Sequence, residues 1–155
     1  MSESVVNFLV CVNAEKYSEV ALHYAAVEAK KHKGMVTILH VIEPIDYQTL
    51  GSIAAKMRQE TLDDAENLLN KLAAKVVVWS GITPVFMVKE GLIENEIIAT
   101  VEQEKGISAI VMGVASDSSV KSKIIPPVVS ALGSKLKMPM IIVPGNMTNK
   151  QIDNM

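Results

Sequence analysis

The sequence predicts an α/β fold in which helices cover both faces of a small parallel β-sheet. Short apolar runs alternate along the chain with stretches whose apolar residues recur at helical spacing. The short runs are apolar throughout, which is typical of strands that are buried on both faces of a parallel sheet. A chain of 155 residues is the usual size of one domain with one core.

The first half of the chain is predicted to fold as strand, helix, strand and helix. Residues 7–12 form an apolar strand, and residues 15–33 form a helix that ends in a cluster of Lys and His residues before Gly34. Cations suit the negative end of a helix, and glycine suits its left-handed cap. The apolar run Met35–Ile42 is the second strand. A long helix over residues 52–78 follows, because its apolar residues make one stripe opposite acidic residues.

The second half continues the alternation of strands and helices. Residues 84–88 are a third strand, since a leading proline suits a strand start or a sheet edge. Residues 94–105 are predicted to be helical because apolar residues recur on one side. Residues 107–112 form a fourth strand, which is predicted to close in a turn at Gly113.

The last part of the chain is predicted to hold one more helix and one more strand. Pro126 and Pro127 cannot lie inside a helix, but proline is favoured in the first turn, so the helix is expected to start there and to run to about Lys137. Residues 140–143 are the fifth strand. We expect residues 1–145 to form a single domain and residues 146–155 to be a flexible tail.

Composition and charge exclude several functional classes. Although 49% of the residues are hydrophobic, no run approaches the roughly 18 apolar residues of a membrane-spanning helix. The formal net charge of −2 gives no basic field for nucleic acid or for an anionic membrane. The start of the chain does not resemble a signal peptide, and the one cysteine, Cys11, cannot form an internal disulfide. We therefore expect a cytoplasmic protein.

Ligands of open parallel sheets bind beyond the carboxyl ends of the strands. In this chain Asn13 and Ala14 follow the first strand, and Gly113 follows the fourth. The fourth strand leads into a loop and then into a helix, which is the geometry of an anion site. Any ligand is therefore expected near Gly113.

Four segments resemble the universal stress protein (UspA) family: FLVCVNAEKYSEVALHYAAVEAKKHKGMVTILHVIEP, EGLIENEII, SAIVMG and KMPMIIVP. The resemblance runs from about Phe8 to Pro144. It implies an adenine nucleotide alpha hydrolase-like fold with a five-stranded parallel sheet of order 3-2-1-4-5. It also implies that the chain can form dimers, as many members do, and some members bind ATP. The candidate nucleotide-binding residues are Asn13, Ala14, Val41, Gly113, Ser116 and Ser118.

The phosphate loop departs from the pattern of ATP-binding members, Gly-x2-Gly-x9-Gly-Ser/Thr. Gly113 matches the first glycine, but the second falls on Ser116 and the closing pair falls on Pro126 and Pro127. The acidic residue that members place after strand one is Asn13. Proline has no N–H, and Ser116 adds a Cβ where the backbone would approach phosphate. The chain is therefore expected to bind no ATP in the family manner and to carry no cofactor.

An alternative is a nucleotide-binding sensor or weak ATPase that uses an altered loop. Ser116 and Ser118, together with Lys121 and Lys123, can hold a smaller anion or a different nucleotide pose. The competing interpretation is a polar surface loop, which serine-rich turns commonly form. We favour the surface loop. If the loop does bind a ligand, we expect ATP or another adenine nucleotide.

The remaining reactive residues have structural explanations. His23 and His32 are expected to be exposed on a helix, His40 to be a satisfied semi-buried residue, and Cys11 to be an inert buried thiol. No catalytic constellation or metal site is predicted. The fifth strand, from Met140 to Val143 by sequence, is apolar and lies at the sheet edge by resemblance. A homodimer that pairs this edge with its copy is expected, together with an unknown protein partner.

Overall fold

The apolar runs of the sequence form the five strands of one sheet. The computed structural model describes residues 5–44, 51–115, 129–130 and 135–155. The strands are β1 (Asn7–Cys11), β2 (Met35–Ile42), β3 (Val85–Glu90), β4 (Ala109–Val114) and β5 (Met140–Pro144). They lie in the order β3-β2-β1-β4-β5, and every neighbouring pair is parallel. The predicted α/β fold and the sheet order that the resemblance implied are both confirmed.

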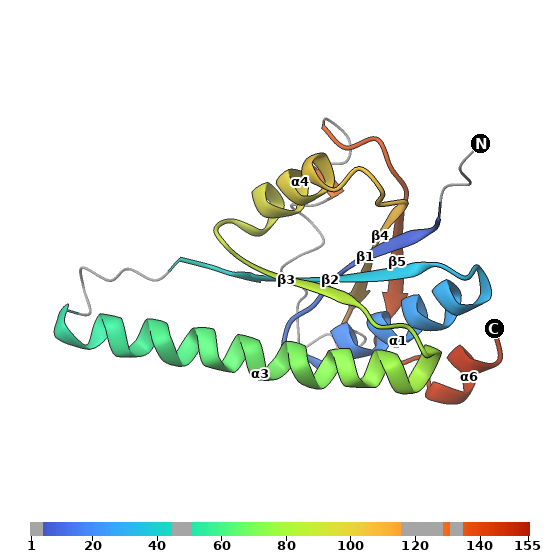
Figure 1. Ribbon diagram of the computed structural model, residues 1–155, viewed down its shortest axis with the longest axis horizontal. Helices are drawn as coiled ribbons and strands as arrows, with labels where there is room; N and C mark the ends of the chain where they lie inside the picture. The colour runs from blue at the N-terminus through green and yellow to red at the C-terminus, as the bar shows by residue number, and fades with distance from the viewer. Residues whose placement is uncertain (1–4, 45–50, 116–128, 131–134) are drawn as a thin grey trace.

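The described helices lie on both faces of this sheet (Figure 1). They are α1 (Lys16–Lys31), α3 (Ala54–Ser80), α4 (Ile93–Gln103) and α6 (Asn149–Asp153), and a short 3-10 turn, η1 (Gly51–Ile53), precedes α3. Figure 1 shows α1 and α3 on one face of the sheet and α4 on the other, with α6 beside the end of α3. Within the described ranges, no helix combines the length and apolar character needed to span a membrane.

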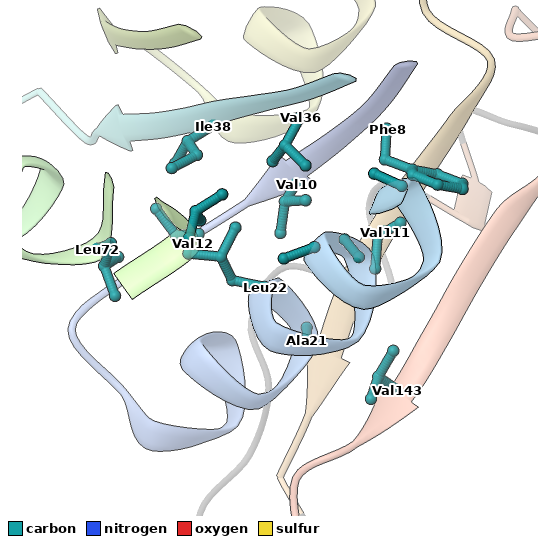
Figure 2. Close-up of a cluster of buried hydrophobic side chains, with 14 of the residues drawn as sticks. Phe8, Val10, Val12, Ala21, Leu22, Val36, Ile38, Leu72, Val111 and Val143 are labelled. Carbon is teal, nitrogen blue, oxygen red and sulfur yellow. The ribbon is translucent and has the colours of Figure 1, made fainter. Parts of the chain in front are cut away.

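Alternate residues of each strand supply two separate apolar layers. Phe8, Val10 and Val12 pack with α1 and with Leu72 of α3, as Figure 2 shows. Leu9 and Cys11, between them in the sequence, face the opposite layer with residues of α4. The period of two along β1 therefore divides the core between the two sheet faces. Both layers are needed because a parallel sheet must be covered on each side.

Two details of the strand and helix ends differ from the sequence prediction. β4 continues through Gly113, which is buried and pairs with Val143 of β5, so the predicted turn at this glycine is wrong. Of the last predicted helix, Val129 and Ser130 are helical, whereas residues 135–137 are not, so the helix ends before Lys137. Pro126 and Pro127, the predicted start of this helix, lie outside the described residues.

The chain after β5 is the larger correction, because the predicted flexible tail contains the helix α6. Thr148 caps it: the Thr148 side chain accepts a hydrogen bond from the Gln151 N–H at 3.1 Å, and the Gln151 side chain accepts one from the Thr148 N–H at 2.9 Å. Ile152 is fully buried among residues of the α1 layer. The capping box and this buried side chain together hold the segment in place.

Candidate functional site

Asn13 lies at the carboxyl end of β1, where the sequence predicts a ligand. Its main-chain N–H donates to Ser18 Oγ at 2.9 Å, and its side-chain Nδ2 donates to the Tyr17 hydroxyl at 3.0 Å. Its Oδ1 accepts a hydrogen bond from the Glu15 N–H at 2.8 Å. The amide of Asn13 is therefore engaged in shaping the turn from β1 into α1, with a donor that an aspartate would lack. Ala14, the next candidate residue, is exposed.

Tyr17 covers the glycine that the sequence singled out. A Cβ on Gly113 would overlap the main-chain carbonyl oxygen of Tyr17, and a Cβ on Gly145 would lie 2.6 Å from the Tyr17 Cβ. Gly113 thus lets the first turn of α1 pack directly against β4. Close packing between helix and strand explains this glycine without any ligand. The structure brings Asn13 and Gly113 together, since both contact Tyr17.

The other candidate residues are not gathered at the same point. Val41 of β2 is half-buried and packs against the apolar layer on the α4 face. Gly113 faces Tyr17 of α1, on the opposite side of the sheet. Ser116 and Ser118, together with Pro126 and Pro127, lie outside the described residues, so the phosphate loop itself has no structural description.

His40 and Cys11 are placed as the sequence predicts. His40 is half-buried, and its Nδ1 lies 2.9 Å from the Val12 carbonyl oxygen, which gives this ring nitrogen a partner. Burial raises the pKa of the Cys11 thiol from its ordinary value of 9.0 to about 12, so the thiol stays protonated at neutral pH. Across the described ranges, no group of three or more His, Cys, Asp or Glu residues is placed to hold a metal ion.

A groove that the sequence did not predict lies between α1, α3 and the segment from β5 into α6. Its volume is about 640 Å³, which is within the range of small-molecule sites. Its lining includes neither Asn13, Val41 nor Gly113. The residues that characterise it are Lys16, Glu19, His23, Lys75, Trp79 and Met147. We call this the α1–α3–α6 groove.

His23 is a lining residue of this groove, and its predicted exposure is wrong. The side chain is 2% exposed, and its ring stacks on Trp79 with centroids 4.4 Å apart and planes 19° apart. Its Nε2 donates to Asp153 Oδ1 at 2.8 Å, which ties α1 to α6. Because the carboxylate can only accept, Nε2 carries the hydrogen. A helix that faces only a sheet would leave this position open to water, but here Trp79 of α3 and Asp153 of α6 contact it.

The second ring nitrogen of His23 is unusual. Within the part of the chain that the structure describes, His23 Nδ1 is a buried side-chain atom with no hydrogen-bond partner. Leaving such an atom unsatisfied costs about 1–3 kcal/mol. Buried polar atoms without partners call for a functional explanation or for a bound group that pairs with them.

Charged side chains line the groove. Lys75 forms an ion pair with Glu19, and both side chains are about one-third exposed. Lys16 is exposed, and none of the ion pairs found among the described residues includes it. Two cations therefore face one carboxylate, so the lining carries a net positive charge.

The sequence carries one signal for this groove, which the prediction of a flexible tail did not use. Thr148 and Gln151 have the spacing of a capping box and are followed by the apolar Ile152, a pattern that is typical of the start of a short docked helix. No comparable signal exists for His23, because a polar residue within a helix gives no indication that a second helix covers it.

Comparisons with known proteins agree with the fold. A model of the universal stress protein family matches residues 6–144 of this chain. A search of curated proteins found no match. Universal stress protein UspA from Lactobacillus plantarum superimposes with a TM-score of 0.74 at 17% identity, covering 92% of this chain and 99% of that one.

Two further solved structures hold nucleotides. The universal stress protein from Archaeoglobus fulgidus in complex with dAMP has a TM-score of 0.62 at 16% identity, over 92% of this chain and 99% of that one. A universal stress protein in complex with cAMP has a TM-score of 0.63 at 11% identity, over 93% and 100% of the two chains. These likenesses show a shared fold. Because the family model spans nearly the whole sheet and its helices, this chain belongs to the universal stress protein family.

Proposed function

We propose that this protein is a non-enzymatic stress-response protein that acts in the cytoplasm as a homodimer, through contacts with a protein partner. We also propose that it does not bind ATP in the manner of ATP-binding family members. The observation that carries this is Asn13, a neutral residue where the resemblance places an acidic one. Its amide is engaged with Glu15 and Tyr17.

The sequence of the phosphate loop supports the same proposal. Pro126 and Pro127 replace a Gly-Ser/Thr pair and lack two main-chain donors, and the hydroxyl of the pair is also lost. Each charge-assisted hydrogen bond contributes roughly 1.5–3 kcal/mol, so losing two or three weakens affinity by several orders of magnitude. Asp117 adds a negative charge to the same loop.

Calorimetric titration of the purified protein with ATP, ADP and AMP tests this proposal. We expect no heat of binding for ATP at micromolar concentrations and no phosphate release on prolonged incubation. Micromolar ATP affinity would overturn the proposal. The matched gain-of-function variant combines Ser116→Gly, Pro126→Gly and Pro127→Ser, and it is expected to acquire ATP binding. Asn13→Asp added to that variant measures the part of the loss that belongs to strand one.

The alternative function is a nucleotide-binding sensor of ATP or AMP, or a weak ATPase, that uses an altered phosphate loop. It is favoured by the two neighbouring structures, one in complex with dAMP and one in complex with cAMP. A monophosphate needs fewer phosphate contacts than ATP, so the missing donors of the loop matter less to it. Binding of AMP, cAMP or ATP without phosphate release selects the sensor, whereas phosphate release from ATP selects the ATPase.

The homodimer is proposed through β5. This strand stands at the end of the sheet order, and Ile142 in its middle is 45% exposed. An apolar edge strand invites pairing with another chain, and pairing across a two-fold axis would cover it.

A further inference from the structure

The α1–α3–α6 groove combines an apolar wall with cationic side chains. Trp79 is half-buried and supplies the largest flat surface, with Met147 from the segment after β5 beside it in the lining. The groove needs α6, which follows residue 144 and so lies outside the segment that the family model matches. One wall of the groove therefore comes from a segment beyond the part of the chain that the family model matches.

We propose that this groove binds a small amphipathic carboxylate, an organic anion with an aromatic or aliphatic body. The body would lie against Trp79 and Met147, and the carboxylate would face Lys16 and Lys75. The volume of about 640 Å³ accommodates such a molecule. The site is separate from the carboxyl edge of the sheet, so this proposal does not depend on the proposed function.

The charges select an anion over a cation. Lys16 has no ion-pair partner among the described residues, and Glu19 neutralises only Lys75. A bound carboxylate would neutralise the net positive charge of the lining, whereas a bound amine would be repelled by it.

His23 gives the groove a fixed wall. It lines the groove, and its ring is held by Asp153 through Nε2. Its ring also fixes the plane of Trp79 by stacking. An aromatic platform held in one orientation loses little entropy when a ligand packs on it.

Trp79 is the one tryptophan of the chain, so its fluorescence reports directly on the groove. The probe is phenylbutyrate, with phenylbutanol as the uncharged analogue and butyrate as the anion without an aromatic body. We expect phenylbutyrate to change Trp79 emission with one molecule bound per chain, and both analogues to bind at least about fivefold more weakly. Absence of a saturable response to phenylbutyrate at millimolar concentration would overturn the proposal.

Three charge variants give opposed expectations. Lys16→Met should weaken phenylbutyrate binding about fivefold, and Glu19→Gln should strengthen it, because it removes a like charge and frees Lys75. Lys71→Met is the matched control, since Lys71 is an exposed residue one turn before Lys75 and does not line the groove. Unchanged affinity in both Lys16→Met and Glu19→Gln, or an equal loss in Lys71→Met, would refute the assignment. Circular dichroism of each variant verifies that the fold is intact.

Discussion

Tyr17 is the residue on which the carboxyl edge of the sheet depends. Its hydroxyl accepts a hydrogen bond from Asn13, and its main chain lies against Gly113 and Gly145. One residue thus joins the β1–α1 turn to β4 and to the segment after β5. The contact is possible because two glycines allow α1 to approach more closely than a Cβ permits.

Gly113→Ala is predicted to destabilise the protein by about 1–3 kcal/mol, because the added Cβ would overlap the Tyr17 carbonyl oxygen and either α1 or β4 would have to move. Urea denaturation that is followed by circular dichroism measures this change in the free energy of unfolding.

Gly106→Ala is the control for that experiment. A Cβ on Gly106 meets no atom within 4 Å, so its effect should stay within about 0.5 kcal/mol. Equal stability of the two variants would mean that Gly113 is not required for packing, and the interpretation of this glycine as a ligand-binding residue would regain support.

These residues show where the sequence was informative and where it was not. Gly113 was recognised as important, but sequence alone could not distinguish a turn from a close helix contact, since both exclude a Cβ. His23 was misplaced because its burial depends on α3 and α6, which are distant in sequence. The burial of Cys11 was predicted correctly, because the residue lies within an apolar run that forms a central strand.

At the scale of elements, α6 is the helix that the sequence analysis did not predict. It contains five residues, which is too few for a helical period to be recognised. It is retained in the structure by Ile152, which is fully buried, and by the hydrogen bond from His23 to Asp153. The strands and the long helices, by contrast, were predicted to within a few residues because their apolar patterns extend over many positions.

Ile152→Ala is predicted to lower the free energy of unfolding by about 2 kcal/mol or more and to release α6 from α1. The cause is the loss of a fully buried side chain at the point where α6 meets the core. Hydrogen exchange of the Ile152 and Asn154 amides, which donate to Thr148 and Lys150, would report the release.

Lys150→Ala is the matched variant on the same helix, because Lys150 is exposed. It should change stability by no more than about 0.5 kcal/mol. If Ile152→Ala leaves amide protection and Trp79 fluorescence unchanged, then α6 is held by its capping box and by Asp153 alone.

At the scale of the whole molecule, the sheet presents two edges, β3 and β5. The proposed homodimer uses β5, whose exposed Ile142 lies in an otherwise apolar strand. The sequence predicted the strand order through the family resemblance. Association between chains depends instead on which apolar side chains remain exposed on the folded chain, and the sequence alone does not give this.

Ile142→Lys is predicted to convert a dimer to a monomer, because it introduces a charge into the strand that would pair with its copy. Sedimentation equilibrium measures the mass directly, and the unaltered protein should have twice the mass of one chain.

Val85→Lys provides the comparison, since Val85 is 47% exposed on β3, the opposite edge of the sheet. It should leave the mass unchanged. A monomeric unaltered protein, or a dimer that survives Ile142→Lys, would exclude association through this edge.

The position of β1 has a consequence for synthesis on the ribosome. This strand emerges first but becomes the centre of the sheet, where Phe8 pairs with Val36 on one side and with Ala109 on the other. While translation proceeds between those two partners, the nascent chain carries an apolar strand with one unpaired edge. Until β4 has left the exit tunnel, such an edge can bind chaperones or pair incorrectly with another strand.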